Sequence, residues 1–155
     1  MELTLRGHED RYAVEQLMLA LFPESGGTAV STLSRGKTWI TAGAAVTLDG
    51  RTSRAARRIK TSEESVRLRR RALQQAFYAA ALPLLPGAPP WGALAGVRPT
   101  KITSKYLSEG HTPKEADRLL KDVYYVTPER RRLAVDCSQA TLRAKEQLLP
   151  EDISL

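Results

Sequence analysis

The spacing of hydrophobic positions changes along this chain, from a mixture of strand and helix periods to helical spacing alone. Residues 2–6 alternate in polarity, which predicts a short half-buried strand. Residues 14–21 place apolar side chains three and four positions apart, the spacing of one face of a helix. Three more strands are expected over residues 28–33, 37–48 and 51–60. A second helix should begin at Thr61, where Glu64 follows three positions later as in a capping box.

The dipeptide Asp49-Gly50 predicts a tight two-residue hairpin between the last two of these strands. Such a turn fixes the register, so that Ile40 should lie opposite Ile59. The face that should be buried holds Ile40, Ala42, Ala44, Val46 and Leu48. The opposite face holds Trp39, Thr41, Arg54, Arg58 and Lys60. This second face is either a surface for an anionic partner, or a plain surface on which a second layer or the stems of the Arg and Lys side chains cover the Trp39 ring.

Proline and glycine concentrate in residues 82–90, LPLLPGAPP, which should end the second helix and separate two subdomains. We expect an α+β subdomain over residues 1–88 and a helical subdomain over residues 89–155. The predicted fold class is therefore α+β: a β-α-β-β-β-α unit with an antiparallel hairpin, followed by a segment of three helices.

Each of the three later helices has a start or stop signal. Pro99 suits the first turn of the first helix, and Gly110 suits its end. Thr112 and Glu115 form a second capping box, and Pro150 should close the third helix. The expected apolar stripe of the third helix consists of Leu133, Cys137, Ala140, Ala144 and Leu148. A cysteine in such a stripe is expected to act as a small hydrophobe.

Composition narrows the class of protein further. The net charge of +7 and pI near 9.9 favour an anionic partner such as nucleic acid. No run of about 18 apolar residues predicts a membrane span, and the first ten residues do not resemble a signal peptide. The single cysteine excludes an internal disulfide. We therefore expect a cytoplasmic protein without a membrane partner.

The chain offers no familiar catalytic constellation. His8 and His111 are far apart in sequence, lack carboxylates or cysteines at metal-ligand spacing, and are expected at the surface. No phosphate-binding glycine loop or nucleophile elbow is present. We accordingly assign no catalytic, cofactor-binding or metal-binding residue.

One segment, residues 89–102, combines an indole, small residues and two cations. Trp91 can bury a large ring, and the small residues after it allow another backbone to approach closely. Arg98 and Lys101 stand at the start of a predicted helix, where an anion could bind. The segment is therefore either a brace between the two subdomains or an anion site.

The sequence PWGALAGVRPTKI, followed by YLSEGHTPKEADRLLKDVYYVTPERRRLAVDCSQ, resembles the region ahead of the catalytic barrel in HemZ-type coproporphyrinogen dehydrogenases. These are radical-SAM proteins similar to oxygen-independent coproporphyrinogen III oxidase. The positions that match the family's pattern are Trp91, Gly92, Leu94, Gly96, Arg98, Pro99, Thr100, Lys101, Glu109, Gly110, Tyr125 and Val126. Residues 1–88 match only in the order of elements and in details such as RGHE.

The resemblance implies a non-catalytic N-terminal domain that docks on a radical-SAM barrel of the same polypeptide. In that family a CxxxCxxC motif supplies the thiolates of a [4Fe–4S] cluster, and the barrel binds S-adenosylmethionine. This chain has no such motif, so we expect no cofactor in it. Its last residues, Ile153–Leu155, look like the start of the family's first barrel strand. A basic nucleic-acid-binding module built on the hairpin face is the alternative.

Overall fold

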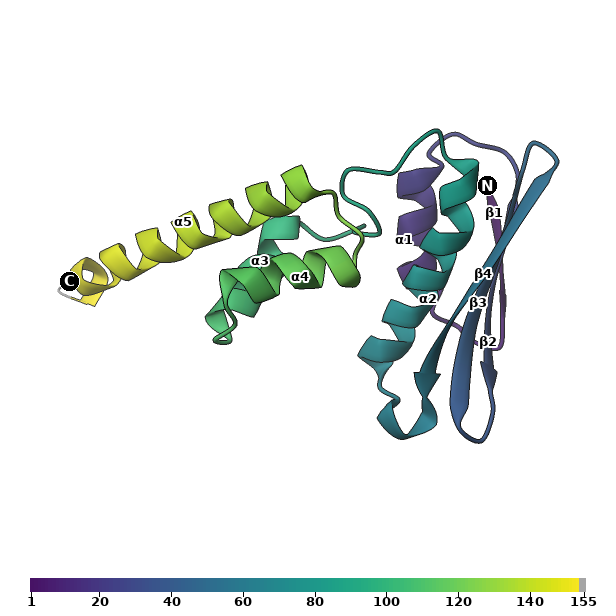
Figure 1. Ribbon diagram of the computed structural model, residues 1–155, viewed down its shortest axis with the longest axis horizontal. Coiled ribbons are helices and arrows are strands. Elements are labelled where there is room, and N and C mark those ends of the chain that lie inside the picture. The colour runs from purple at the N-terminus through teal and green to yellow at the C-terminus, as the bar shows by residue number, and fades with distance from the viewer. Residues whose placement is uncertain (154–155) are drawn as a thin grey trace. The chain divides into compact units, whose positions relative to one another are not determined.

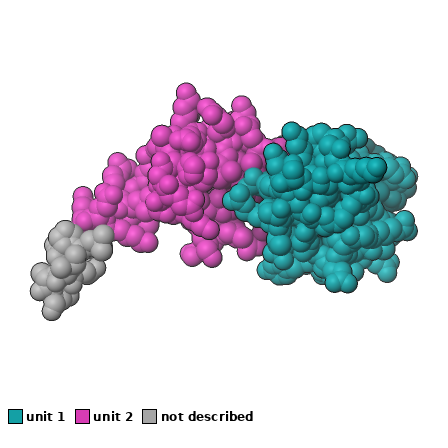
Figure 2. All heavy atoms as spheres, turned by 90° about the horizontal axis from the view of Figure 1, so that it is seen from below, with its two compact units in different colours: residues 1–89 teal, residues 90–155 magenta. Residues whose placement is uncertain are grey.

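The computed structural model describes the backbone of residues 1–153 and the surroundings of the side chains of residues 1–147. Two compact units divide the chain, Met1–Pro89 and Pro90–Leu155 (Figure 2). We call them the sheet unit and the helical unit. The division falls after Pro89, where the sequence predicted a boundary after residue 88.

The sheet unit has the predicted β-α-β-β-β-α order, so the α+β class is confirmed. Its elements are β1 (Glu2–Arg6), α1 (Arg11–Leu21), β2 (Thr28–Arg35), β3 (Trp39–Leu48), β4 (Arg51–Lys60) and α2 (Val66–Ala81). The strands form one sheet in the order β1-β2-β3-β4, in which β1 is parallel to β2 and the other pairs are antiparallel. Figure 1 shows α1 and α2 side by side on the same face of this sheet.

The hairpin between β3 and β4 has the predicted turn and register. Asp49 and Gly50 both have positive φ, 51° and 77°, as the favoured two-residue turn requires. Ile40 lies opposite Ile59, as counted from the sequence. The predicted buried face is confirmed for Ile40, Ala42, Ala44 and Val46, while Leu48 at the turn is only half-buried.

The core of the sheet unit lies between this face and the two helices. Ile40 and Val46 from β3, Leu17 from α1, and Leu73 and Phe77 from α2 are fully buried. Burying an aliphatic or aromatic side chain of this size contributes about 1.5–3 kcal/mol to stability. The helices are therefore held on the sheet by one continuous apolar layer.

The predicted capping box at Thr61 is wrong. Residues Thr61–Glu63 form a single 3-10 turn, and α2 begins at Val66 with Ser65 as its N-cap. The hydroxyl of Thr61 instead donates to the backbone oxygen of Lys37, at 2.9 Å. Two arginines attract the carboxylate of Glu64, so neither capping partner is available for the helix.

The helical unit contains the three predicted helices, α3 (Pro99–Ser108), α4 (Pro113–Asp122) and α5 (Pro128–Ile153). The second capping box is confirmed, because Thr112 and Glu115 exchange two hydrogen bonds of 3.1 Å. The predicted stop at Pro150 is wrong, because α5 continues to Ile153. A proline removes one backbone donor, but a helix can run through the position at the cost of that hydrogen bond.

The buried face of α5 is rotated from the predicted stripe. Ala134, Val135 and Ser138 are buried, whereas Leu133 and Cys137 are exposed. Ala140 and Ala144 are exposed too, and the side chain of Leu148 lies outside the described residues. The predicted face was wrong because Ser138, which lies off the apolar stripe, is buried and hydrogen-bonded to Thr103 of α3.

Candidate functional site

The basic face of the hairpin is assembled as the sequence predicted. Trp39 lies directly opposite Lys60, and Thr41 lies opposite Arg58. The guanidinium carbon of Arg58 lies 5.8 Å from the centroid of the Trp39 ring, a cation–π contact. The Trp39 side chain nevertheless remains 40% exposed, and Arg54, Arg58 and Lys60 are exposed around it. We call these four residues the Trp39 face.

No described carboxylate neutralises the Trp39 face. The ion pairs of the sheet unit lie elsewhere: Asp10 binds Arg69 and Arg70 at 3.4 and 3.3 Å, and Glu64 binds Arg35 at 2.6 Å. Within residues 1–147, no ion pair involves any cation of the Trp39 face. The face therefore carries uncompensated positive charge.

Trp91 packs on the hydrophobic core of the helical unit. It is half-buried against a cluster of apolar side chains from α4, α5 and the loop between them. The members of that cluster are Ala116, Leu120, Val126, Ala134 and Val135. The guanidinium carbon of Arg130 lies 5.8 Å from the ring centroid. The described contacts of Trp91 thus make it a structural residue of the helical unit, and its expected role as a brace between subdomains stays a prediction.

The residues after Trp91 are held by backbone contacts to the loop between α4 and α5. Gly92 has φ of +57°, and a Cβ at this position would collide with the backbone of Tyr124 and Tyr125. The amide of Ala93 donates to the backbone oxygen of Tyr124 at 2.7 Å. Thr127 donates to the Pro90 oxygen through both its amide, at 3.0 Å, and its hydroxyl, at 3.1 Å. We call this paired structure, residues 90–94 with 124–127, the clasp.

Arg98 and Lys101 follow the clasp but are not part of it. Arg98 is the residue before α3 and has an extended backbone, and its side chain makes no cap bond. Both side chains are exposed. The seven candidate residues therefore form two groups, the Trp39 face on the sheet unit and Trp91, Arg98 and Lys101 on the helical unit.

Both histidines are partly exposed, as expected of surface residues, but each also makes specific contacts. His8 is half-buried, its Nδ1 accepts from the Asp10 amide at 3.1 Å, and its Nε2 lies 3.0 Å from the Ser31 hydroxyl. Burial lowers the pKa of His8, and the nearby carboxylate of Asp10 opposes this only in part. His111 stacks on Tyr106, with ring centroids 3.7 Å apart. Both rings therefore pack against neighbouring residues. These contacts could not be foreseen from two isolated histidines in the sequence.

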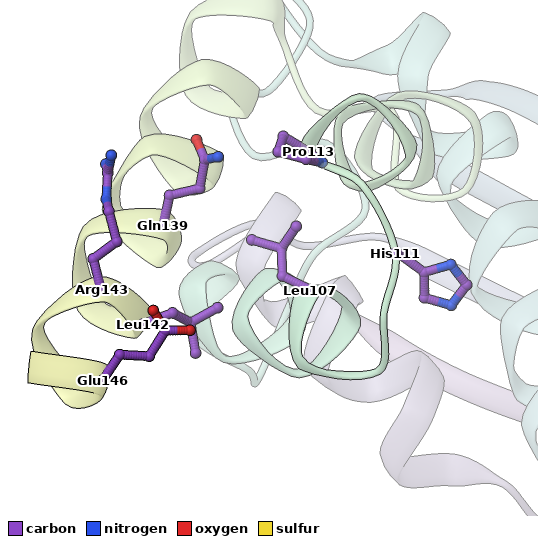
Figure 3. A pocket seen from close by; sticks show the side chains of 7 residues that line it. All are labelled: Leu107, His111, Pro113, Gln139, Leu142, Arg143 and Glu146. Carbon is purple, nitrogen blue, oxygen red and sulfur yellow. The ribbon is translucent and has the colours of Figure 1, made fainter. Parts of the chain in front are cut away.

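Sequence reasoning also missed an open pocket in the helical unit. The pocket has a volume of about 230 Å³ and lies between the end of α3, the start of α4 and the middle of α5. Its lining consists of Leu107, His111, Pro113, Gln139, Leu142, Arg143 and Glu146. In Figure 3 the His111 ring points away from Arg143 and Glu146, so these groups do not converge. No motif connects the lining residues, because they meet only when α5 packs across α3.

No three His, Cys, Asp or Glu side chains within the described part of the chain are placed to hold a metal ion. The described helices also include none with the length and apolar character needed to cross a bilayer. Searches against family models, curated proteins and solved structures found no match to this chain. Its function must therefore be inferred from its own residues.

Proposed function

We propose that this chain is the non-catalytic N-terminal accessory domain of a radical-SAM enzyme similar to coproporphyrinogen III oxidase, an oxidoreductase of porphyrin biosynthesis. It docks on the catalytic barrel of the same polypeptide and helps to orient the substrate there. The observation that carries the proposal is the clasp. The two stretches that hold the resemblance, PWGALAG and YYVT, meet there although 37 positions separate Pro90 from Thr127.

The clasp supports a structural role for the matching residues. Gly92 is required by its positive φ and by the closeness of the Tyr124 backbone. Trp91 fills the adjoining apolar cluster, and Val126 belongs to that cluster. Gly110, another matched residue, has φ of +98° just beyond the end of α3. The residues that match the family's pattern are therefore more typical of a rigid structural element than of a catalytic loop.

The residues of this chain do not fit a [4Fe–4S] cluster of its own. A cluster of this kind needs several thiolates, and the chain has one cysteine, Cys137, which is exposed on α5. The proposal therefore leaves the cluster and S-adenosylmethionine to the barrel. It includes a cytoplasmic location, which the single cysteine supports.

The exposed cations beside the clasp are the proposed docking contacts. Arg98 and Lys101 have free side chains one helical turn apart, where carboxylates of a barrel could reach both. Arg118 and Lys121 on α4 offer a matched control pair, because they are equally exposed and differ by the same spacing.

The first test is to read the coding sequence beyond Leu155, where the proposal expects a CxxxCxxC motif. The second is to mix this chain with a purified radical-SAM barrel of the class and to measure binding by calorimetry. Arg98→Glu/Lys101→Glu should weaken binding at least about tenfold, and Arg118→Glu/Lys121→Glu should have little effect. Absence of the motif together with absence of binding would refute the proposal.

Anaerobic reconstitution with iron and sulfide tests separately the proposal that this chain is non-catalytic. The chain should bind no stoichiometric cluster and should show no visible charge-transfer band. A loaded cluster, or conversion of coproporphyrinogen by this chain alone, would contradict the assignment.

A further inference from the structure

Within the sheet unit, one face of the sheet has no helix on it. Figure 1 shows α1 and α2 on the same side, the side that carries Ile40 and Val46. The strand register assigns alternate residues to the other side, from Glu2 in β1, Thr28 in β2, Trp39 in β3 and Thr52 in β4. We call this side the open face. It contains the whole Trp39 face.

The open face is strongly basic. Its charged residues, read from the register, are Glu2, Arg6, Arg54, Arg58 and Lys60. Four of these five are cations, and the only carboxylate lies at the start of β1, on the opposite edge strand from β4. No described carboxylate forms an ion pair with any of the four.

Small side chains form the floor beside the tryptophan. Thr41, Gly43 and Ala45 follow Trp39 along the open face of β3, and Ala56 lies opposite Gly43. A flat aromatic or heterocyclic group can therefore lie over Gly43 and Ala45 beside the ring, with Arg54 and Arg58 of β4 at its edge. Such a floor suits a planar ligand better than a projecting side chain of a protein partner.

We propose that the open face binds single-stranded nucleic acid, with Trp39 stacking on a base and Arg54, Arg58 and Lys60 following the phosphates. An exposed aromatic ring next to cations is the combination by which sheets bind single strands. Along β4, Arg58 and Lys60 lie about 7 Å apart and Arg54 and Arg58 about 13 Å apart, from the usual rise of a strand. These spacings let the cations contact successive phosphates of an extended strand.

The charge alone would also attract an acidic protein surface, and the ring distinguishes the two partners. Acidic side chains gain little from an exposed indole, whereas each stacked base gains roughly 5- to 150-fold in affinity. The Trp39 side chain is 40% exposed even with Arg58 over it, so ring surface remains for a base. The proposal uses only the sheet unit and does not rest on the accessory-domain proposal.

The test is fluorescence anisotropy with a labelled single-stranded RNA of about 12 nucleotides, at low and at physiological salt. The variants are Trp39→Ala, Trp39→Phe and Arg54→Glu/Arg58→Glu. The control is Arg67→Glu/Arg118→Glu, which changes two exposed arginines outside the open face. Each double variant lowers the net charge by 4, from +7 to +3. Far-UV circular dichroism checks that all variants fold.

Wild type should bind with Kd on the order of 1–10 μM at physiological salt. Arg54→Glu/Arg58→Glu should lose at least about tenfold more affinity than the control pair and should reduce the salt slope by about 1.4. Trp39→Ala should weaken binding at least about fivefold, and Trp39→Phe should restore most of it.

Three results would overturn the proposal. Equal losses in the two double variants would show that net charge alone attracts the RNA. No effect of Trp39→Ala, with RNA displaced equally well by a poly-glutamate peptide, would assign the face to an acidic protein. Binding that vanishes in wild type at physiological salt would leave only nonspecific attraction.

Discussion

The two units of this chain hold their folds together by different means. The sheet unit buries a continuous apolar layer, in which Leu17, Ile40 and Phe77 have no exposed surface. The helical unit buries a smaller apolar cluster beside polar groups: the hydroxyls of Thr103 and Ser138 are both inaccessible and bonded to each other. Backbone contacts of the clasp complete it. The helical unit should therefore respond sharply to single changes of geometry, and the sheet unit to loss of volume.

The largest effect is expected from Gly92→Ala. The new Cβ would meet the backbone of Tyr124 and Tyr125, and an alanine would be strained at φ of +57°. We expect the free energy of unfolding of the helical unit to fall by about 3–5 kcal/mol. Hydrogen exchange with mass spectrometry should show faster exchange in residues 90–147 and unchanged exchange in the sheet unit.

Gly87→Ala is the matched control, since no atom lies within 4 Å of its Cβ position. It should leave the exchange of both units unchanged. Equal protection in Gly92→Ala and Gly87→Ala would show that the clasp does not constrain the helical unit.

Trp91→Ala should have the next largest effect. The Trp91 ring is half-buried, and its removal also breaks the contact with Arg130. We therefore expect the free energy of unfolding to fall by about 2–3 kcal/mol, less than for a fully buried tryptophan. Urea unfolding followed by circular dichroism and by hydrogen exchange measures the loss and locates it. A change of less than about 0.5 kcal/mol would be that of an ordinary surface residue and would return Trp91 to the anion-site interpretation.

The buried hydroxyl pair should show coupling. Thr103→Val removes the threonine partner of the Ser138 hydroxyl, which keeps its bond to the Thr100 backbone oxygen at 3.3 Å, and should cost about 1–2 kcal/mol. Ser138→Ala should cost a similar amount, but the double variant should cost less than the sum, because the bond between the two hydroxyls is lost only once. Urea unfolding of the four proteins gives the coupling energy, and strict additivity would mean that the two hydroxyls are independent.

The smallest effect concerns pH and the sheet unit. Burial lowers the pKa of His8, so the unfolded chain binds a proton more readily than the folded chain below about pH 6.5. Stability contributed by neutral His8 is thus complete above that pH and is lost as the pH falls toward the lower folded pKa. Urea unfolding at pH 7 and at pH 5.5 should show a smaller acid loss in His8→Asn than in wild type. An identical loss in both would mean that His8 does not titrate differently on folding.

How far the sequence predicts the structure depends on whether distant residues compete with a local pattern. Asp49-Gly50 determines a hairpin by its own conformational preference, and the buried side of β3 follows from a period of two. The motif at Thr112 and Glu115 succeeds as a capping box because Oε1 of Glu115 accepts from the Thr112 amide, while His111 contacts the other oxygen, Oε2, at 3.5 Å. The same motif at Thr61 fails because Arg35 and Arg69 hold Glu64. Local rules are reliable only where distant partners do not compete.

The candidate site was predicted in the same uneven way. Counting along the hairpin correctly placed Trp39 beside Arg58. By contrast, the contact of Gly92 with Tyr124 joins parts of the chain that no periodicity relates, and the buried face of α5, with Ser138, is rotated from the expected stripe. These features depend on tertiary contacts, which a single sequence does not contain.

The late position of α2 has a consequence for synthesis on the ribosome. The β3–β4 hairpin can form within microseconds of its completion, but the layer that covers its apolar face includes Leu73 and Phe77. Translation from Val46 to Ala81 takes roughly 2–7 s at ordinary elongation rates. For that time the nascent chain presents Ile40 and Val46 to the surrounding proteins. Early protection by a chaperone, or slow codons placed after α2, would therefore raise the yield of folded protein.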